Sequence, residues 1–125
     1  MNRIRLVVAI LGCAVASAAW AQEDEDFLVQ TAGDLAVLCA AEPEETRYAA
    51  AIHMCHGFLV GVHQYHAALQ ADGSQGIYCV PETNPPTRNE AAEGFAAWVM
   101  QTPDVAGLPA VEGLVRWAAF SFPCQ

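Results

Sequence analysis

The stretch TRYAAAIHMCHGFLVGVHQYHAAL, residues 46–69, decides the fold, because it contains no proline and its apolar residues recur with helical period. At about 100° per residue, its larger side chains fall within a stripe roughly 120° wide. The members of this stripe are Cys55, Phe58, Leu59, Val62, Tyr65, His66 and Leu69. We therefore predict one long helix at the centre of the fold, with this stripe facing the core.

Two glycines, Gly57 and Gly61, lie four residues apart on the flank of the stripe. Each glycine in a helix interior costs about 1 kcal/mol relative to alanine, so the pair predicts the close approach of another backbone. The neighbour is either another helix of the same chain or a helix of a partner subunit. The sequence leaves both alternatives open.

Three shorter helices are expected around the central one. Thr31 followed by Asp34 is a capping signal for a short helix that buries Leu35, Leu38 and Cys39. A capping box at Thr87–Glu90 opens a helix that Thr102-Pro103 ends, and Pro109 opens a last helix that Pro123 ends. Their expected buried faces are Ala91, Phe95, Trp98 and Thr102 in the first, and Val111, Leu114, Val115, Ala118 and Phe122 in the second. The predicted fold class is therefore all-α, a small four-helix domain.

Residues 70–86 between the central helix and the next one form a long loop with turn residues at 71–76 and a proline-rich end. Loops of this length in a small domain are usually functional or held by a covalent link. Cys79 lies within it and favours the covalent link.

Four cysteines, Cys39, Cys55, Cys79 and Cys124, follow residue 21. An even number in a short exported chain predicts two disulfides, and the spacing allows three connectivities. We prefer Cys39–Cys55, which would join two successive helices, with Cys79–Cys124, which would tie the long loop to the C-terminus. Zinc is disfavoured because no CxxC pair occurs.

The first 21 residues resemble a cleaved signal peptide. Arg3 and Arg5 precede an apolar run, and Ala19-Trp20-Ala21 supplies small residues before a cut at Gln22. A membrane anchor is disfavoured because the run has about 14 residues, against roughly 20 needed to span a bilayer. The expected organisation is therefore a signal peptide at 1–21, an acidic flexible segment at 22–30 and a helical domain at 31–125, located in the periplasm.

The chain beyond residue 21 is strongly acidic. Its 14 Asp and Glu residues face only three arginines, Arg47, Arg88 and Arg116, and give a formal charge of −11. Nucleic acids and anionic membranes need a basic footprint, so neither is an expected partner. The acidity suits a basic protein surface, although a solvated acidic exterior that serves solubility explains it equally well.

All four histidines, His53, His56, His63 and His66, lie on the central helix. A metal would use His63 and His66, but no recognised ligand motif accompanies them, and we predict no metal and no cofactor. A structural role with His66 partly buried is preferred, and pH sensing is chemically possible. No nucleophile elbow, phosphate loop or dinucleotide turn is present, so we predict a binding protein and not an enzyme.

The order of motifs resembles the Rap/Tai family of immunity proteins. The resemblance rests on TAGDL at 31–35, Cys39, CHGFLVGV at 55–62, YCVP at 78–81 and FPC at 122–124. It implies a small helical periplasmic protein, often a homodimer, that neutralises a type VI secretion amidase by occluding its active-site cleft. Those motifs belong to the scaffold, so no effector contact can be transferred by motif.

The candidate partner-binding loop is chosen instead by its length and expected exposure. It comprises Asp72, Gly73, Ser74, Gln75, Gly76, Ile77 and Tyr78. The small residues among them could enter a narrow cleft. The alternative function is an acid-stress chaperone, because 14 acids and four histidines suit a switch at low pH. Two disulfides argue against the lability that such a switch needs.

Overall fold

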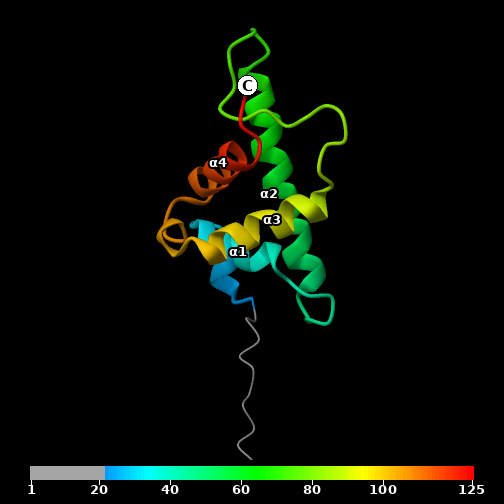
Figure 1. Cartoon of the computed structure of the whole chain (residues 1–125). Helices are drawn as coiled ribbons and strands as arrows, with labels where there is room; N and C mark the ends of the chain where they lie inside the picture. Colours follow the sequence, from blue (N-terminus) through cyan, green and yellow to red (C-terminus); the bar gives the residue numbers. More distant parts are fainter. Residues whose placement is uncertain (1–21) are drawn as a thin grey trace, which may run out of the picture.

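The computed structural model of the chain describes residues 22–125 and contains four α-helices (Figure 1). They are α1 (Ala32–Cys39), α2 (Tyr48–Leu69), α3 (Arg88–Gln101) and α4 (Ala110–Ser121), with short 3-10 helices η1 (Asp24–Leu28) and η2 (Pro103–Val105). No strand occurs in residues 22–125, where Thr31 and Pro109 form one isolated bridge. The all-α prediction is confirmed, and the predicted signal peptide at 1–21 lies outside the described residues.

Capping boxes mark where two of these helices, α1 and α3, begin. The Asp34 N–H donates to Thr31 Oγ1 at 3.1 Å, and the Thr31 N–H donates to Asp34 Oδ2 at 2.8 Å, which closes the capping box of α1. Thr87 and Glu90 form the same reciprocal pair at the start of α3. Such boxes satisfy N–H groups that would otherwise have no partner at the first helical turn.

The short helix α1 is the centre of the packing, because it contacts each of the other three helices. Leu35 and Leu38 of α1 and Phe95 of α3 are fully buried, and Phe95 meets the Trp117 ring of α4 edge-on at 5.9 Å between centroids. Burying a large apolar side chain contributes about 1.5–3 kcal/mol. The largest fully buried side chains therefore come from α1 and α3, together with Cys55 of α2.

Two disulfides fix the ends of this arrangement, in the preferred connectivity. Cys39–Cys55 joins the end of α1 to α2, and Cys79–Cys124 joins the α2–α3 loop to the C-terminus. The loops that they close span 16 and 45 residues. In the chain-entropy model such links contribute about 3 and about 4 kcal/mol to stability.

The buried faces of α3 and α4 differ in phase from the prediction. In α3 the buried residues are Ala92, Phe95, Ala96 and Val99. In α4 they are Ala110, Gly113, Leu114, Trp117 and Ala118, while Val111 is 52% exposed. Together the two buried faces include several alanines and a glycine, which a pattern based on large apolar side chains overlooks.

The expected flexible segment at 22–30 contains η1, and its flexibility stays a prediction. The Arg47 guanidinium pairs with Asp24 Oδ1 at 2.7 Å and lies over the Phe27 ring, 4.2 Å from its centroid. Gln22 is buried. These contacts place the segment against the linker between α1 and α2.

Candidate functional site

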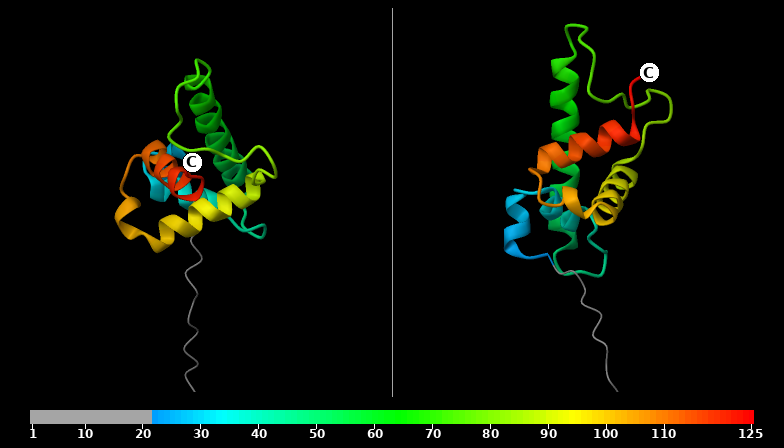
Figure 2. Two further views of the ribbon diagram at one scale, coloured as in Figure 1. Left: turned by 45° about the horizontal axis from the view of Figure 1, so that its top comes forward. Right: turned by 60° about the vertical axis from the view of Figure 1, so that its left-hand side comes forward.

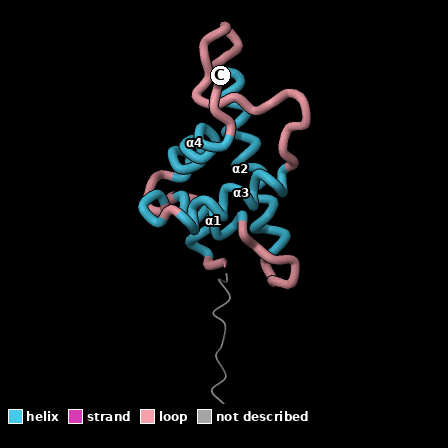
Figure 3. Tube along the Cα trace, viewed as in Figure 1, coloured by secondary structure: helices cyan, strands magenta, loops and turns pink. Residues whose placement is uncertain are grey.

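The candidate binding loop lies at the end of α2 that extends beyond the other helices. Figures 1 and 2 show the upper part of α2 projecting from the helical body, with the loop folded over its end beside the C-terminus. Figure 3 shows the whole connection between α2 and α3 as irregular structure. A 22-residue helix is about 33 Å long, whereas α1 has only eight residues. The last turns of α2 therefore extend past the other helices of residues 22–125.

The start of the loop is a compact turn made by its own polar groups. The Ser74 N–H donates to Asp72 Oδ1 at 3.0 Å, and the Ser74 hydroxyl donates to the Leu69 carbonyl at 2.9 Å. Hydrogen bonding from Ser74 to the Asp72 carboxyl, first of all from the Ser74 N–H, lowers the pKa of that carboxyl. Gly73 has φ +85°, a conformation that glycine adopts without steric cost. The turn therefore has a defined shape despite its exposure.

His66 holds the end of the loop against α2. The Ile77 N–H donates to His66 Nε2 at 3.0 Å, and the Tyr78 ring stacks on the His66 ring with centroids 3.9 Å apart. The Tyr78 hydroxyl lies 3.5 Å from His63 Nδ1. Burial, and then the neighbouring His63, lower the pKa of His66. Neutral imidazole is the form that can accept from Ile77, so the loop is attached by a histidine that is kept neutral.

The Cys79–Cys124 disulfide completes the attachment. The Cys79 N–H donates to the Phe122 carbonyl at 2.8 Å, and Cys124 Sγ lies 3.5 Å from the Gly76 carbonyl oxygen. Below these residues is a small cavity of about 280 Å³ lined by Tyr78, Phe122 and side chains of α2, α3 and α4. The loop is thus fixed both to α2 and to the C-terminal segment.

The structure brings the candidate loop residues together but does not expose all of them. Residues 72–75 are exposed, Ile77 is 64% exposed, and Gly76 is half-buried. Tyr78 is 5% exposed and belongs to the core, so its inclusion in an exposed contact surface is corrected. Its ring is taken up by the contact with His66.

Two residues missed by the sequence argument lie at the same end of the molecule. Tyr65 and Leu69 were assigned to the buried stripe of α2, but they are 68% and 57% exposed. The apolar stripe of α2 becomes exposed to solvent where α2 extends beyond the other helices. Together with residues 72–77 they form a surface that we call the tip, with Tyr65, Leu69 and Ile77 as its apolar members. The sequence signal that could have predicted their exposure is the length of α2, which is much greater than that of its neighbours.

Gly57 and Gly61 do not touch another helix within residues 22–125. A Cβ atom added to either would meet no atom within 4 Å. The first alternative, close packing inside the chain, is therefore wrong for residues 22–125. Close packing against a partner subunit stays a prediction.

The histidines do not gather into a site. His66 is buried and His53 and His63 are exposed, whereas His56 is half-buried and its Nε2 has no hydrogen-bond partner within the described chain. Burial, then the charges of Arg88 and His53, lower the pKa of His56. Over residues 22–125, no three His, Cys, Asp or Glu side chains form a group able to hold a metal. None of the described helices has the length and apolar character needed to cross a bilayer.

The family model of the Rap1a immunity proteins matches residues 31–124, from the cap of α1 to the last cysteine. No curated protein and no solved structure matches the chain. The match covers all four helices and both disulfides, and the chain belongs to the family of Rap1a immunity proteins.

Proposed function

We propose that this protein is a periplasmic immunity protein that binds a peptidoglycan amidase of a type VI secretion system and occludes its active-site cleft with the tip. The observation that carries the proposal is an exposed loop that His66 and the Cys79–Cys124 disulfide hold at the end of α2, where this helix extends beyond the core. Family membership supports an effector protein as the partner. Inhibition by occlusion needs no catalytic residue in this chain.

The chemistry of the tip suits insertion into a cleft. Gly73 and Ser74 are small and stand at the turn, while Ile77 and Leu69 supply exposed apolar surface behind it. A rigid turn loses little conformational freedom on binding, so more of the contact energy appears as affinity. The turn hydrogen bonds and the His66 contact provide this rigidity.

The location and the oligomeric state belong to the same proposal. Disulfides persist in oxidising compartments, and the two disulfides fit the periplasm, where peptidoglycan amidases act. A homodimer would cover the face of α2 that carries Gly57 and Gly61, which is open in the described chain. Glycines allow two helices to approach more closely than residues with side chains do.

The test needs a candidate amidase effector, and a neighbouring gene that encodes an NlpC-like Cys/His site would be the first choice. Ile77→Asp places a charge in the apolar part of the tip, and Val111→Asp makes the same change at a residue of α4 that is 52% exposed. We expect the first variant to weaken inhibition of peptidoglycan cleavage by tenfold or more, since a charge is buried unpaired in the complex. Val111→Asp should inhibit as the parent does.

Deletion of residues 73–76 is the second arm of the test. It removes the turn while the helices and both disulfides remain. Circular dichroism and a thermal melt establish that each variant is folded. Unchanged inhibition by a folded deletion variant, or equal losses in the two aspartate variants, would show that the tip is not the inhibitory surface.

A further inference from the structure

A second concave surface lies near the opposite end of α2 from the tip. It is a cleft of about 780 Å³ between the C-terminal end of α1, the linker to α2 and one side of α3, and we call it the α1–α3 cleft. Val37, Ile52, Ala96 and Met100 give it an apolar lining, and Met100 is 59% exposed. Methionine side chains adapt to different partners and are common on binding surfaces.

Carboxylates stand around this apolar lining. Glu42, Glu45 and Glu93 line the cleft, and no arginine or lysine does. The three arginines of residues 22–125 lie elsewhere: Arg47 pairs with Asp24, and Arg116 pairs with Glu112 at 2.5 Å. The third, Arg88, lines the smaller cavity below the loop. The negative charge of the cleft is therefore not neutralised by a base that lines it.

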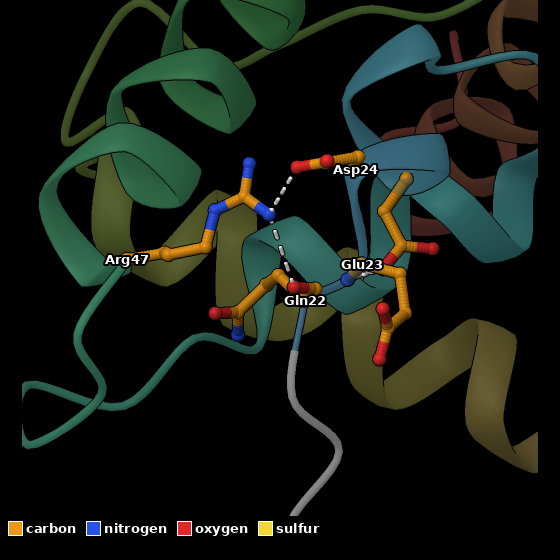
Figure 4. Close-up of polar contacts among 5 residues, drawn as sticks. Gln22, Glu23, Asp24 and Arg47 are labelled. Carbon is orange, nitrogen blue, oxygen red and sulfur yellow. Dashed lines mark hydrogen bonds and ion pairs between the residues drawn. The ribbon is translucent and has the colours of Figure 1, made fainter.

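The wall that carries Glu45 is held in place by the N-terminal segment. The Glu42 N–H donates to Glu45 Oε1 at 2.8 Å, and the Gln22 side-chain amide donates to the other oxygen of the same carboxylate. Figure 4 shows Arg47 reaching both Asp24 and the Gln22 carbonyl oxygen, at 2.7 and 3.4 Å. The Cys39–Cys55 disulfide fixes the junction of α1 with α2. The cleft is thus formed before any partner binds.

We infer that the α1–α3 cleft is a docking site for a protein segment whose apolar side chains are flanked by lysine or arginine. The apolar side chains of the bound segment would pack against the apolar lining of the cleft, and its lysine or arginine side chains would pair with Glu42 and Glu93 at the rim. A second copy of this chain complements the cleft poorly, because the chain contains no lysine and two of the three arginines in residues 22–125, Arg47 and Arg116, are already in ion pairs. The site is separate from the tip and does not depend on the proposed inhibition.

A set of three synthetic peptides tests the chemistry of the occupant. The probes are 14-residue fluorescein-labelled peptides: an amphipathic Leu/Lys peptide, its Leu/Glu counterpart and a Ser/Lys peptide without an apolar face. Fluorescence anisotropy with the purified protein at low salt should show binding of the Leu/Lys peptide and weaker binding of the other two. The affinity should fall as sodium chloride rises, because exposed ion pairs are screened. Equal binding of the Leu/Glu peptide would overturn the inference.

Matched variants locate the binding. Glu42→Gln with Glu93→Gln removes two rim charges, and Glu82→Gln with Asp104→Asn removes two exposed charges that do not line the cleft. We expect the rim pair to weaken binding of the Leu/Lys peptide by about three- to tenfold, and the control pair by less than twofold. Equal effects of the two pairs would mean that the peptide responds only to net charge, which overturns the inference.

Filling the cleft is the last arm. Ala97 is exposed and lines the cleft, so Ala97→Trp should block it without disturbing the core, and peptide binding should fall by tenfold or more. Amide chemical-shift changes on peptide addition should map to α1 and α3. Shifts confined to the tip, or a change of oligomeric state on Ala97→Trp that shows a second copy in the cleft, would contradict the proposal.

Discussion

Replacing His66 with phenylalanine should loosen the tip without unfolding the protein. The Ile77 N–H donates to His66 Nε2 at 3.0 Å, and phenylalanine offers no acceptor there. An aromatic ring at this position still stacks on Tyr78, whose ring lies 3.9 Å from that of His66. The substitution therefore separates the hydrogen bond from the packing.

The size of the effect follows from these two contacts. One hydrogen bond contributes about 0.5–1.5 kcal/mol net, so His66→Phe should raise the opening constant of the loop by about two- to twelvefold. His66→Ala also loses the aromatic contact, worth about another 0.5–1.5 kcal/mol beyond area burial. The alanine variant should therefore open the loop by about five- to 150-fold, while Cys79–Cys124 still limits how far the loop can move.

Amide hydrogen exchange at Ile77, followed by NMR at pH 7.5, measures this opening directly. Exchange at Ile77 should accelerate in the order parent, His66→Phe, His66→Ala, while amides around Leu35 in the core keep their protection. His53→Phe is the matched control, since His53 is exposed on the same helix and does not contact the loop. If Ile77 exchanged equally fast in the parent and His66→Phe, the hydrogen bond would not hold the loop and the reasoning would fail.

The same contact predicts a dependence of stability on pH. Burial lowers the pKa of His66 in the folded protein, so the unfolded chain binds this proton first as the pH falls. The contribution of neutral His66 to stability is complete above the unfolded value of about 6.5. It is lost as the pH falls below that value, and the loss is complete below the folded pKa. Denaturant titrations at pH 7.5 and 5 should show a smaller difference for His66→Phe than for the parent.

Further changes probe the scaffold. Replacing Cys79 and Cys124 with serine should lower the free energy of unfolding by about 4 kcal/mol relative to the oxidised parent, measured by denaturant titration, and the difference should disappear when both proteins are reduced. Gly113→Ala should destabilise by about 1–3 kcal/mol, because its Cβ would collide with the Ala32 side chain, whereas Gly57→Ala should stabilise the monomer by about 1 kcal/mol. Equal melting temperatures for these two variants would contradict the packing. Hydrophobic-dye binding should stay low at both pH 7 and pH 3, and a strong rise at pH 3 would favour an acid-stress chaperone.

The helices and the disulfide connectivity could be predicted because their signals are local. The capping boxes that begin at Thr31 and Thr87 are visible in the sequence and mark the first residues of α1 and α3. Prolines limit where helices can continue, and the central stretch has one dominant period. Cysteines at the ends of predicted elements then favoured one pairing of the three.

The faces of the helices were harder to predict, because burial depends on which neighbour lies opposite. Gly113 packs against Ala32, and Ala92 and Ala96 are among the buried residues of α3, so small residues form part of these buried faces. A pattern that weights large side chains places Val111 inside, although it is 52% exposed. The helical pattern also predicts that Leu69 is buried, but this residue is 57% exposed. The pattern within α2 does not show where the neighbouring helices end.

The two proposed surfaces lie on either side of the core, and this separation has a measurable consequence. Ile52 of the α1–α3 cleft and Leu69 of the tip are 17 residues apart on one helix, which corresponds to about 26 Å. Changes at sites this far apart with no shared partner usually add within about 0.5 kcal/mol. If one effector engaged both surfaces, Ile77→Asp combined with the Glu42 and Glu93 variant should weaken the complex by the product of the separate factors. If the cleft serves another partner, the rim variant should bind the Leu/Lys peptide more weakly and inhibit the amidase as the parent does. The tip variant Ile77→Asp should bind the peptide as the parent does and inhibit the amidase more weakly.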